Sequence, residues 1–118
     1  MNRSALIVGA GAGLSSSLAL QCANLGMDVA LAARNIDKLE DLGIQTGASL
    51  HKCDASKIGD VHHLFQDLDE KLGIPELVVY NPSSRLRGGI ETLDPEKTKE
   101  ALDVTCFGAF LVAQQAAK

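Results

Sequence analysis

Short apolar runs alternate with stretches of helical periodicity along the whole chain. An apolar run without polar alternation is typical of a strand that a parallel sheet buries on both faces. We predict four such strands, at residues 5–8, 29–33, 48–51 and 77–80. Apolar residues three or four positions apart predict the helices that follow these strands. The helices are expected at residues 14–25, 36–42, 61–72 and 95–118.

Local signals mark several helix ends. Gly26, Gly43 and Gly73 follow the apolar stripes of the first three helices, where a glycine commonly ends a helix. Asn35 is a candidate N-cap for the second helix. Asp94 followed by proline is a typical start for the last one. These boundaries divide the chain into four β-α units.

The alternation of buried strands with helices predicts an α/β fold. Right-handed crossovers between parallel strands then give a doubly wound parallel sheet. In such a sheet a ligand binds outside the carboxyl ends of the strands, near the point where the winding reverses. We therefore expect functional residues in the loops that follow the strands.

Composition narrows the class of protein. The 118 residues suit one domain, and 46% apolar with 22% charged residues excludes disorder. No apolar run reaches the roughly 18 residues of a membrane span, and no secretory h-region is visible at the N-terminus. The net charge of −4, from 11 basic and 15 acidic residues, argues against nucleic acid or an anionic membrane as partner. A small-molecule substrate is the expected partner.

The cysteines Cys22, Cys53 and Cys106 are few, odd in number and scattered. They have neither the density of a disulfide scaffold nor the spacing of metal ligands. The adjacent His62 and His63 would point in different directions on a helix and make a poor metal pair. We expect reduced thiols, a cytoplasmic location and no metal site.

The main candidate for chemistry is a glycine-rich loop between the first strand and the first helix. Glycines let the backbone approach a pyrophosphate, and the N–H groups at the helix start favour an anion. A structural turn would use the same residues, but their place at the start of a βαβ unit favours dinucleotide binding. The P-loop lysine is absent, which disfavours nucleoside triphosphate hydrolysis. The candidate cofactor contacts here are Gly9, Gly11, Ala12, Gly13, Leu14 and Ser15.

The end of the second strand indicates which dinucleotide is bound. An NAD site usually places an acid there for the ribose hydroxyls, whereas this chain has two alanines followed by Arg34 and Asn35. A guanidinium suits the 2′-phosphate of NADP. The alternative is a solvent-facing arginine at a strand end. The missing acid and the present base together favour NADP over NAD, with Arg34 and Asn35 as contacts.

With these motifs the sequence resembles the short-chain dehydrogenase/reductase family over its whole length. The family's Thr-Gly-x-x-x-Gly-x-Gly motif is matched by Gly9 and Gly13, while Val8 replaces the threonine and Ser15 the third glycine. The resemblance implies a Rossmann-type fold. It also implies that Asp54 hydrogen-bonds the adenine amine and that residues 80–83 occupy the family's Asn-Asn-Ala-Gly position, with only Asn81 identical. The further cofactor contacts it implies are Asp54, Ala55, Asn81, Pro82 and Ser83.

Residues 102–108 look like the family's Asp-Val-Asn-x-x-Gly helix, with Thr105 in place of the catalytic-helix asparagine. The family's catalytic Ser and Tyr-x-x-x-Lys would fall on a fifth strand and fifth helix, beyond residue 118. The one tyrosine, Tyr80, is followed four residues later by serine rather than lysine. We therefore expect residues 1–118 to be an incomplete NAD(P)-binding domain, cut before the fifth strand, with no catalytic residue of its own.

The resemblance implies an oxidoreductase that transfers a hydride between NADP(H) and a carbonyl or alcohol carbon. A non-catalytic NADP-binding sensor or scaffold is the alternative, favoured by Thr105. A methyltransferase-like fold that binds S-adenosylmethionine would need an acid where Arg34 stands. The last helix carries apolar residues over more than the roughly 100° stripe that one sheet face needs. Together with the family precedent, this predicts a homodimer or homotetramer through that helix.

Overall fold

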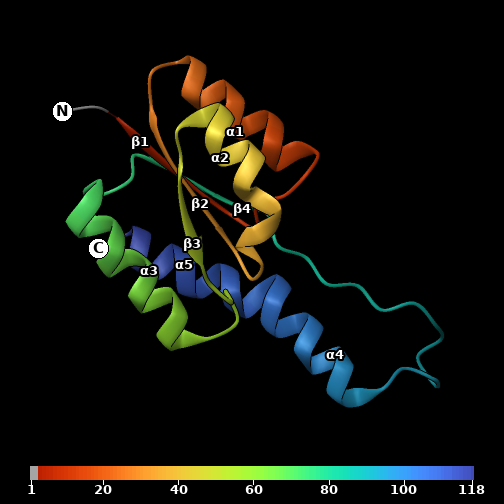
Figure 1. Cartoon of the computed structure of the whole chain (residues 1–118). Coiled ribbons are helices and arrows are strands. Elements are labelled where there is room, and N and C mark those ends of the chain that lie inside the picture. The colour runs from red at the N-terminus through yellow and green to blue at the C-terminus, as the bar shows by residue number, and fades with distance from the viewer. Residues whose placement is uncertain (1–2) are drawn as a thin grey trace.

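The computed structural model describes residues 3–118 and shows one sheet of four parallel strands in the order β3-β2-β1-β4. The predicted doubly wound α/β fold is confirmed (Figure 1). All four predicted strands are present within a residue of their expected limits. They are β1 (Ser4–Val8), β2 (Asp28–Ala33), β3 (Ser49–Lys52) and β4 (Leu77–Tyr80).

The helices cover both faces of the sheet (Figure 1). On one face α1 (Leu14–Asn24) packs beside the short 3₁₀ turn η1 (Ile36–Leu39) and α2 (Glu40–Thr46). On the other face α3 (Ile58–Lys71) packs beside α5 (Gly108–Ala116). A further helix, α4 (Pro95–Leu102), buries no residue and lies away from the sheet together with the loop before it (Figure 1).

Strand β1 shows why the sheet needs both helical layers. Its alternate side chains enter different cores: Ala5 and Ile7 face α1 and α2, whereas Leu6 and Val8 face α3 and α5. All four are at most 1% exposed. A strand buried on both faces has no polar side, which explains the uninterrupted apolar run in the sequence.

The register brings the strand ends together. Val8 at the end of β1 pairs with Ala32 of β2 and with Tyr80 of β4. The chain winds outward from β1 through β2 to β3, and then returns to place β4 on the other side of β1. The winding therefore reverses between β1 and β4, and ligands of doubly wound sheets bind at such a point.

One predicted helix end is wrong. Gly43 lies inside α2, and the helix ends at Gly47, whose φ of 69° is left-handed. Gly43 serves packing instead, because a Cβ there would lie 3.2 Å from Cδ2 of Leu50 on β3. The other signals are confirmed, since Gly26 and Gly73 also have positive φ and the side chains of Asn35 and Asp94 accept backbone N–H bonds.

The last helix is not continuous as predicted. A π-helical turn, η2 (Asp103–Phe107), separates α4 from α5, and the Gly108 N–H bonds the Asp103 carbonyl five residues back. One extra residue in a helical turn changes the spacing of the apolar residues too little to be recognised. The sequence pattern therefore predicted a single helix. Within residues 3–118, no helix has the length and apolar character needed to cross a membrane.

Candidate functional site

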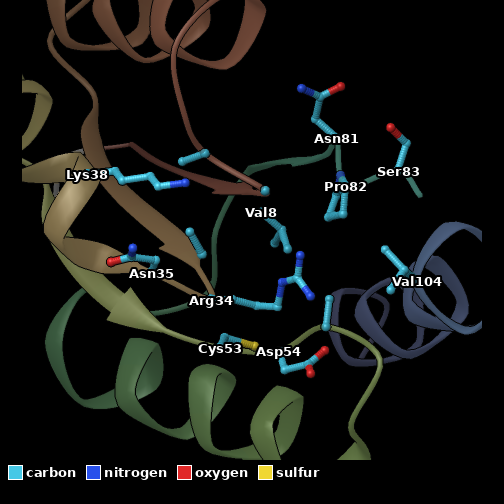
Figure 2. Close-up of a pocket in the computed structure, with 14 residues that line it drawn as sticks. Val8, Arg34, Asn35, Lys38, Cys53, Asp54, Asn81, Pro82, Ser83 and Val104 are labelled. Atoms are coloured by element: carbon cyan, nitrogen blue, oxygen red, sulfur yellow. The ribbon is translucent and has the colours of Figure 1, made fainter. Parts of the chain in front are cut away.

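A pocket of about 360 Å³ lies at the carboxyl ends of the strands (Figure 2). Every strand contributes to it through the loop that follows, and η2 closes one side. The lining residues are Val8, Gly9, Ala10, Ala33, Arg34, Asn35, Lys38, Cys53, Asp54, Ala55, Asn81, Pro82, Ser83 and Val104. Eight of the predicted contacts are therefore brought together here: Gly9, Arg34, Asn35, Asp54, Ala55, Asn81, Pro82 and Ser83.

The start of the glycine-rich loop is fixed by its surroundings. Gly9 has a φ of 80°, and a Cβ on it would lie 2.6 Å from the backbone nitrogen of Pro82. The N–H groups of Gly9 and Ala10 both donate to the Ala32 carbonyl, at 2.9 and 3.1 Å. Only glycine fits this turn, because the positive φ and the neighbouring proline both exclude a side chain.

Ser15 has a different position from the other loop residues. It is 1% exposed, donates its hydroxyl to the Gly9 carbonyl at 3.3 Å and accepts a hydrogen bond from Nδ2 of Asn81 at 2.9 Å. Ser15 does not line the pocket. It ties the glycine-rich loop to the loop after β4, so the serine that replaces the family's third glycine serves as a link between the two loops.

The remaining loop residues fall outside the main pocket. Gly11 and Ala12 line a neighbouring recess of about 190 Å³ between α1 and α2. Gly13, with a φ of 94°, is the N-cap position of α1, and Leu14 is 63% exposed. Gly13, Leu14 and Ser15 line neither cavity. A ligand would have to reach across the surface between the two cavities to contact all six predicted loop residues.

Two cations border the pocket at the end of β2. Figure 2 shows Arg34 extending across the pocket toward Asp54, which lies after β3. Lys38 borders both the pocket and the neighbouring recess. Sequence reasoning missed Lys38, although its spacing of four residues from Arg34 at a helix start was a usable signal. The predicted contact Asn35 uses its side chain oxygen to cap η1, accepting the Asp37 N–H at 3.0 Å.

Asp54 is held as a carboxylate. Partial burial by itself would raise its pKa, but hydrogen bonds from the hydroxyl and the N–H of Ser56, at 2.6 and 3.0 Å, together with Lys57 and Arg34, lower the pKa of Asp54 below its usual range. An ionised carboxylate accepts hydrogen bonds and donates none. Asp54 is therefore suited to receive an amine or hydroxyl of a ligand.

Cys53, next to this carboxylate, is buried. Burial, Asp60 and Asp54 raise the pKa of Cys53 to about 11, so its thiol stays neutral near pH 7. A neutral thiol is a poor nucleophile and a poor metal ligand. Residues 3–118 contain no group of three side chains placed to hold a metal ion.

The comparisons with known proteins agree with this geometry. The sequence profile of the family described as enoyl-(acyl carrier protein) reductase matches residues 9–118. The chain belongs to the short-chain dehydrogenase/reductase family. The resemblance seen in the sequence is thereby confirmed, and the residue departures noted above are variations within the family.

Individual relatives show the same likeness. A probable 2,4-dienoyl-CoA reductase of Caenorhabditis elegans is 30% identical over 97% of this chain. A short-chain dehydrogenase/reductase from Mycobacterium marinum has a TM-score of 0.92 and 28% identity over 98% of the chain. An alcohol dehydrogenase of the archaeon Thermococcus sibiricus, solved with 5-hydroxy-NADP, has a TM-score of 0.88 and 27% identity over 99%. The chain spans 39% of the nematode protein and about half of the two solved proteins, 49% and 52%.

Proposed function

We propose that this chain is the NADP(H)-binding portion of an oxidoreductase that transfers a hydride between the nicotinamide and a carbonyl or alcohol carbon. The observation that carries the proposal is the charge pattern of the pocket. Arg34 and Lys38 border it after β2, a segment that contributes no carboxylate to the pocket lining, and the carboxylate of Asp54 follows β3. A 2′-phosphate matches the first feature and an adenine amine the second.

The residues fit the cofactor in three places. Asp54 would accept a hydrogen bond from the adenine amine, and Arg34 with Lys38 would hold the 2′-phosphate. The glycine-rich loop would lie against the pyrophosphate, with Gly9 at the backbone approach that a side chain would block. The bound cofactor would supply the hydride, and the protein would supply orientation and charge. The Thermococcus relative solved with 5-hydroxy-NADP supports the choice of cofactor.

The proton donor of the family's reaction is proposed to lie outside these 118 residues. Tyr80 is the chain's one tyrosine, and its hydroxyl donates to the Val104 carbonyl rather than facing the pocket. We propose that residues 1–118 form one incomplete NAD(P)-binding domain. A serine, a tyrosine and a lysine from the rest of the enzyme would complete the proton transfer.

Titration of the purified protein that contains this chain, with NADPH and NADH in parallel, tests the proposal. We expect NADPH to bind at least about tenfold more tightly, because the 2′-phosphate adds charged hydrogen bonds. Equal affinities or tighter NADH binding would contradict the choice of cofactor. No binding of either dinucleotide would contradict the proposed function as a whole.

One observation favours a non-catalytic sensor or scaffold as second candidate. Thr105 replaces the family's asparagine, and its hydroxyl accepts the Ser84 N–H at 3.1 Å and donates to the Ser84 carbonyl at 3.3 Å. A hydroxyl engaged in this way has no proton left to donate to a water, whereas the family's asparagine amide would have donors for it. NADPH oxidation with carbonyl or enoyl substrates separates the two functions, because a sensor binds NADPH without turnover.

We further propose a homodimer or homotetramer that assembles through the last helix. The apolar side chains Leu102, Phe107 and Phe110 are 60%, 39% and 55% exposed on it. The rings of Phe107 and Phe110 stack with centroids 6.2 Å apart. Such an exposed aromatic pair is typical of an interface rather than of a solvated surface.

Phe110→Glu is expected to convert the assembled protein to monomers in sedimentation at micromolar concentration, since a buried interface does not tolerate an unpaired carboxylate. Ile44→Glu is the control, because Ile44 is 82% exposed on α2 on the opposite face. It should leave assembly unchanged. A wild-type protein that sediments as a monomer, or a Phe110→Glu variant that still assembles, would contradict this interface.

We also propose a reducing compartment, the cytoplasm. Cys22, Cys53 and Cys106 are all free thiols, and the first two are buried. Free cysteines persist where glutathione and thioredoxin keep thiols reduced.

A further inference from the structure

The hydroxyl of Tyr80 joins the end of β4 to η2 behind the pocket wall. It donates to the carbonyl of Val104 in η2. It also occupies the space that a Cβ on Gly108 would need, and that Cβ would lie 2.9 Å from the Ala55 carbonyl. Ala55 and Val104 line the pocket, whereas Tyr80 does not. Tyr80 therefore touches the pocket only through other residues.

The surroundings keep this hydroxyl a donor. Burial is the main cause that raises the pKa of Tyr80, and Cys53 and Asp54 raise it further. The ring is half-buried and packs against the core that α3 and α5 share. A protonated hydroxyl on a ring that packs against the core donates to its acceptor and holds it in place.

A second contact joins η2 to the chain just after β4. Thr105, next to Val104, exchanges two hydrogen bonds with the backbone of Ser84, and Ser84 follows the pocket residue Ser83. The π-helical turn is thus connected to the end of β4 at Tyr80 and to the loop after β4 at Ser84. Both contacts are made by residues of η2, whose π-helical turn is wider than an α-helical turn. Such turns are frequent at functional sites.

We propose that Tyr80 is a positioning residue that fixes Val104 in the pocket wall and thereby sets the affinity for the dinucleotide, with Thr105 as the second attachment point. This inference rests on the proposed function, since it concerns the ligand of the same pocket. Without the two contacts, η2 and the loop after β4 would have to become ordered when the ligand binds. Ordering on binding weakens affinity.

Tyr80→Phe tests the inference, because it removes the hydroxyl and keeps the ring. We expect NADPH to bind about threefold to tenfold more weakly, as for the loss of one hydrogen bond. Hydrogen exchange at residues 103–108 should become faster in the ligand-free variant. The fluorescence of bound NADPH should shift, because the wall beside it is less fixed.

Ile7→Val is the matched control. Ile7 is fully buried on the opposite face of β1, so the variant loses stability without touching the pocket wall. Its NADPH affinity should equal that of the wild type. If Ile7→Val weakens binding as much as Tyr80→Phe, the effect is general loss of stability and the positioning role is overturned.

A second pair of variants decides the question if Tyr80→Phe fails to fold. Thr105 is exposed, so Thr105→Val should fold and bind NADPH more weakly, while Thr105→Ser should retain the wild-type affinity through its hydroxyl. Unchanged affinity in both Tyr80→Phe and Thr105→Val overturns the positioning role and leaves the proposed function intact. A wild-type protein that binds no NADPH overturns both.

Discussion

Arg34→Asp is expected to weaken NADPH binding by about 10- to 100-fold and to leave NADH binding unchanged or slightly tighter. The guanidinium at the end of β2 would lose its charged hydrogen bonds to the 2′-phosphate, each of which contributes about 1.5–3 kcal/mol. The new carboxylate would repel that phosphate and accept the ribose hydroxyls of NADH. Isothermal titration with both dinucleotides measures the change in preference.

Two variants separate the position of Arg34 from charge alone. Arg34→Lys keeps the charge but loses the planar fork, and we expect an intermediate loss of NADPH affinity. Arg85→Asp makes the same charge change on an exposed residue of the loop after β4, outside the pocket lining, and should leave the preference unchanged. If Arg34→Asp lowers the two affinities equally, the 2′-phosphate is not bound at Arg34.

Gly108→Ala is expected to lower the free energy of unfolding by about 3 kcal/mol. Gly108 is buried where α5 begins, and a Cβ there would collide with the Tyr80 hydroxyl and lie 2.9 and 3.2 Å from the carbonyl oxygen and carbon of Ala55. The Ala55 backbone follows β3 and has little room to move, so α5 must shift away from the sheet. Urea unfolding followed by circular dichroism measures the loss.

Gly59→Ala is the matched control for this substitution. Gly59 also lies in a helix, α3, but a Cβ there meets nothing within 4 Å. Alanine should therefore stabilise the protein by up to about 1 kcal/mol through its better helix propensity. A Gly108→Ala variant as stable as Gly59→Ala would show that the contact between α5 and Ala55 does not limit the packing.

Two glycines show which backbone features the sequence predicts and which it does not. Gly9 and Gly43 look alike in sequence, since each follows an apolar pattern. Gly9 ends its strand as predicted, but Gly43 lies inside α2 against Leu50 of β3. A helix end depends on local backbone conformation, which a sequence can signal. A close approach between a helix and a strand depends on a partner that is distant in sequence.

The pocket residues divide in the same way. Arg34 was found because it ends a buried strand where an acid is missing, whereas Asp54 and Asn81 were implied by the family resemblance. All three line the pocket, because parallel strands end at one edge of the sheet. Lys38 and Val104 were missed because neither is among the residues that directly follow a strand. They lie in a 3₁₀ turn and a π-turn. Ser15 was predicted as a cofactor contact, and the structure adds a role that the sequence did not indicate, since its hydroxyl links two loops.

The sequence by itself determined the succession of strands and helices along the chain, the parallel sheet and the edge of the sheet at which the pocket forms. Those properties follow from the continuous apolar runs, because a strand buried on both faces requires helices on both sides. Only the tertiary structure decided the π-turn, the placement of Tyr80 against Val104 and Gly108, and the pairing of Ser15 with Asn81. Tyr80 and Val104 are 24 residues apart, and Ser15 and Asn81 are 66 apart. The geometry of these contacts therefore exists only once distant segments have packed together.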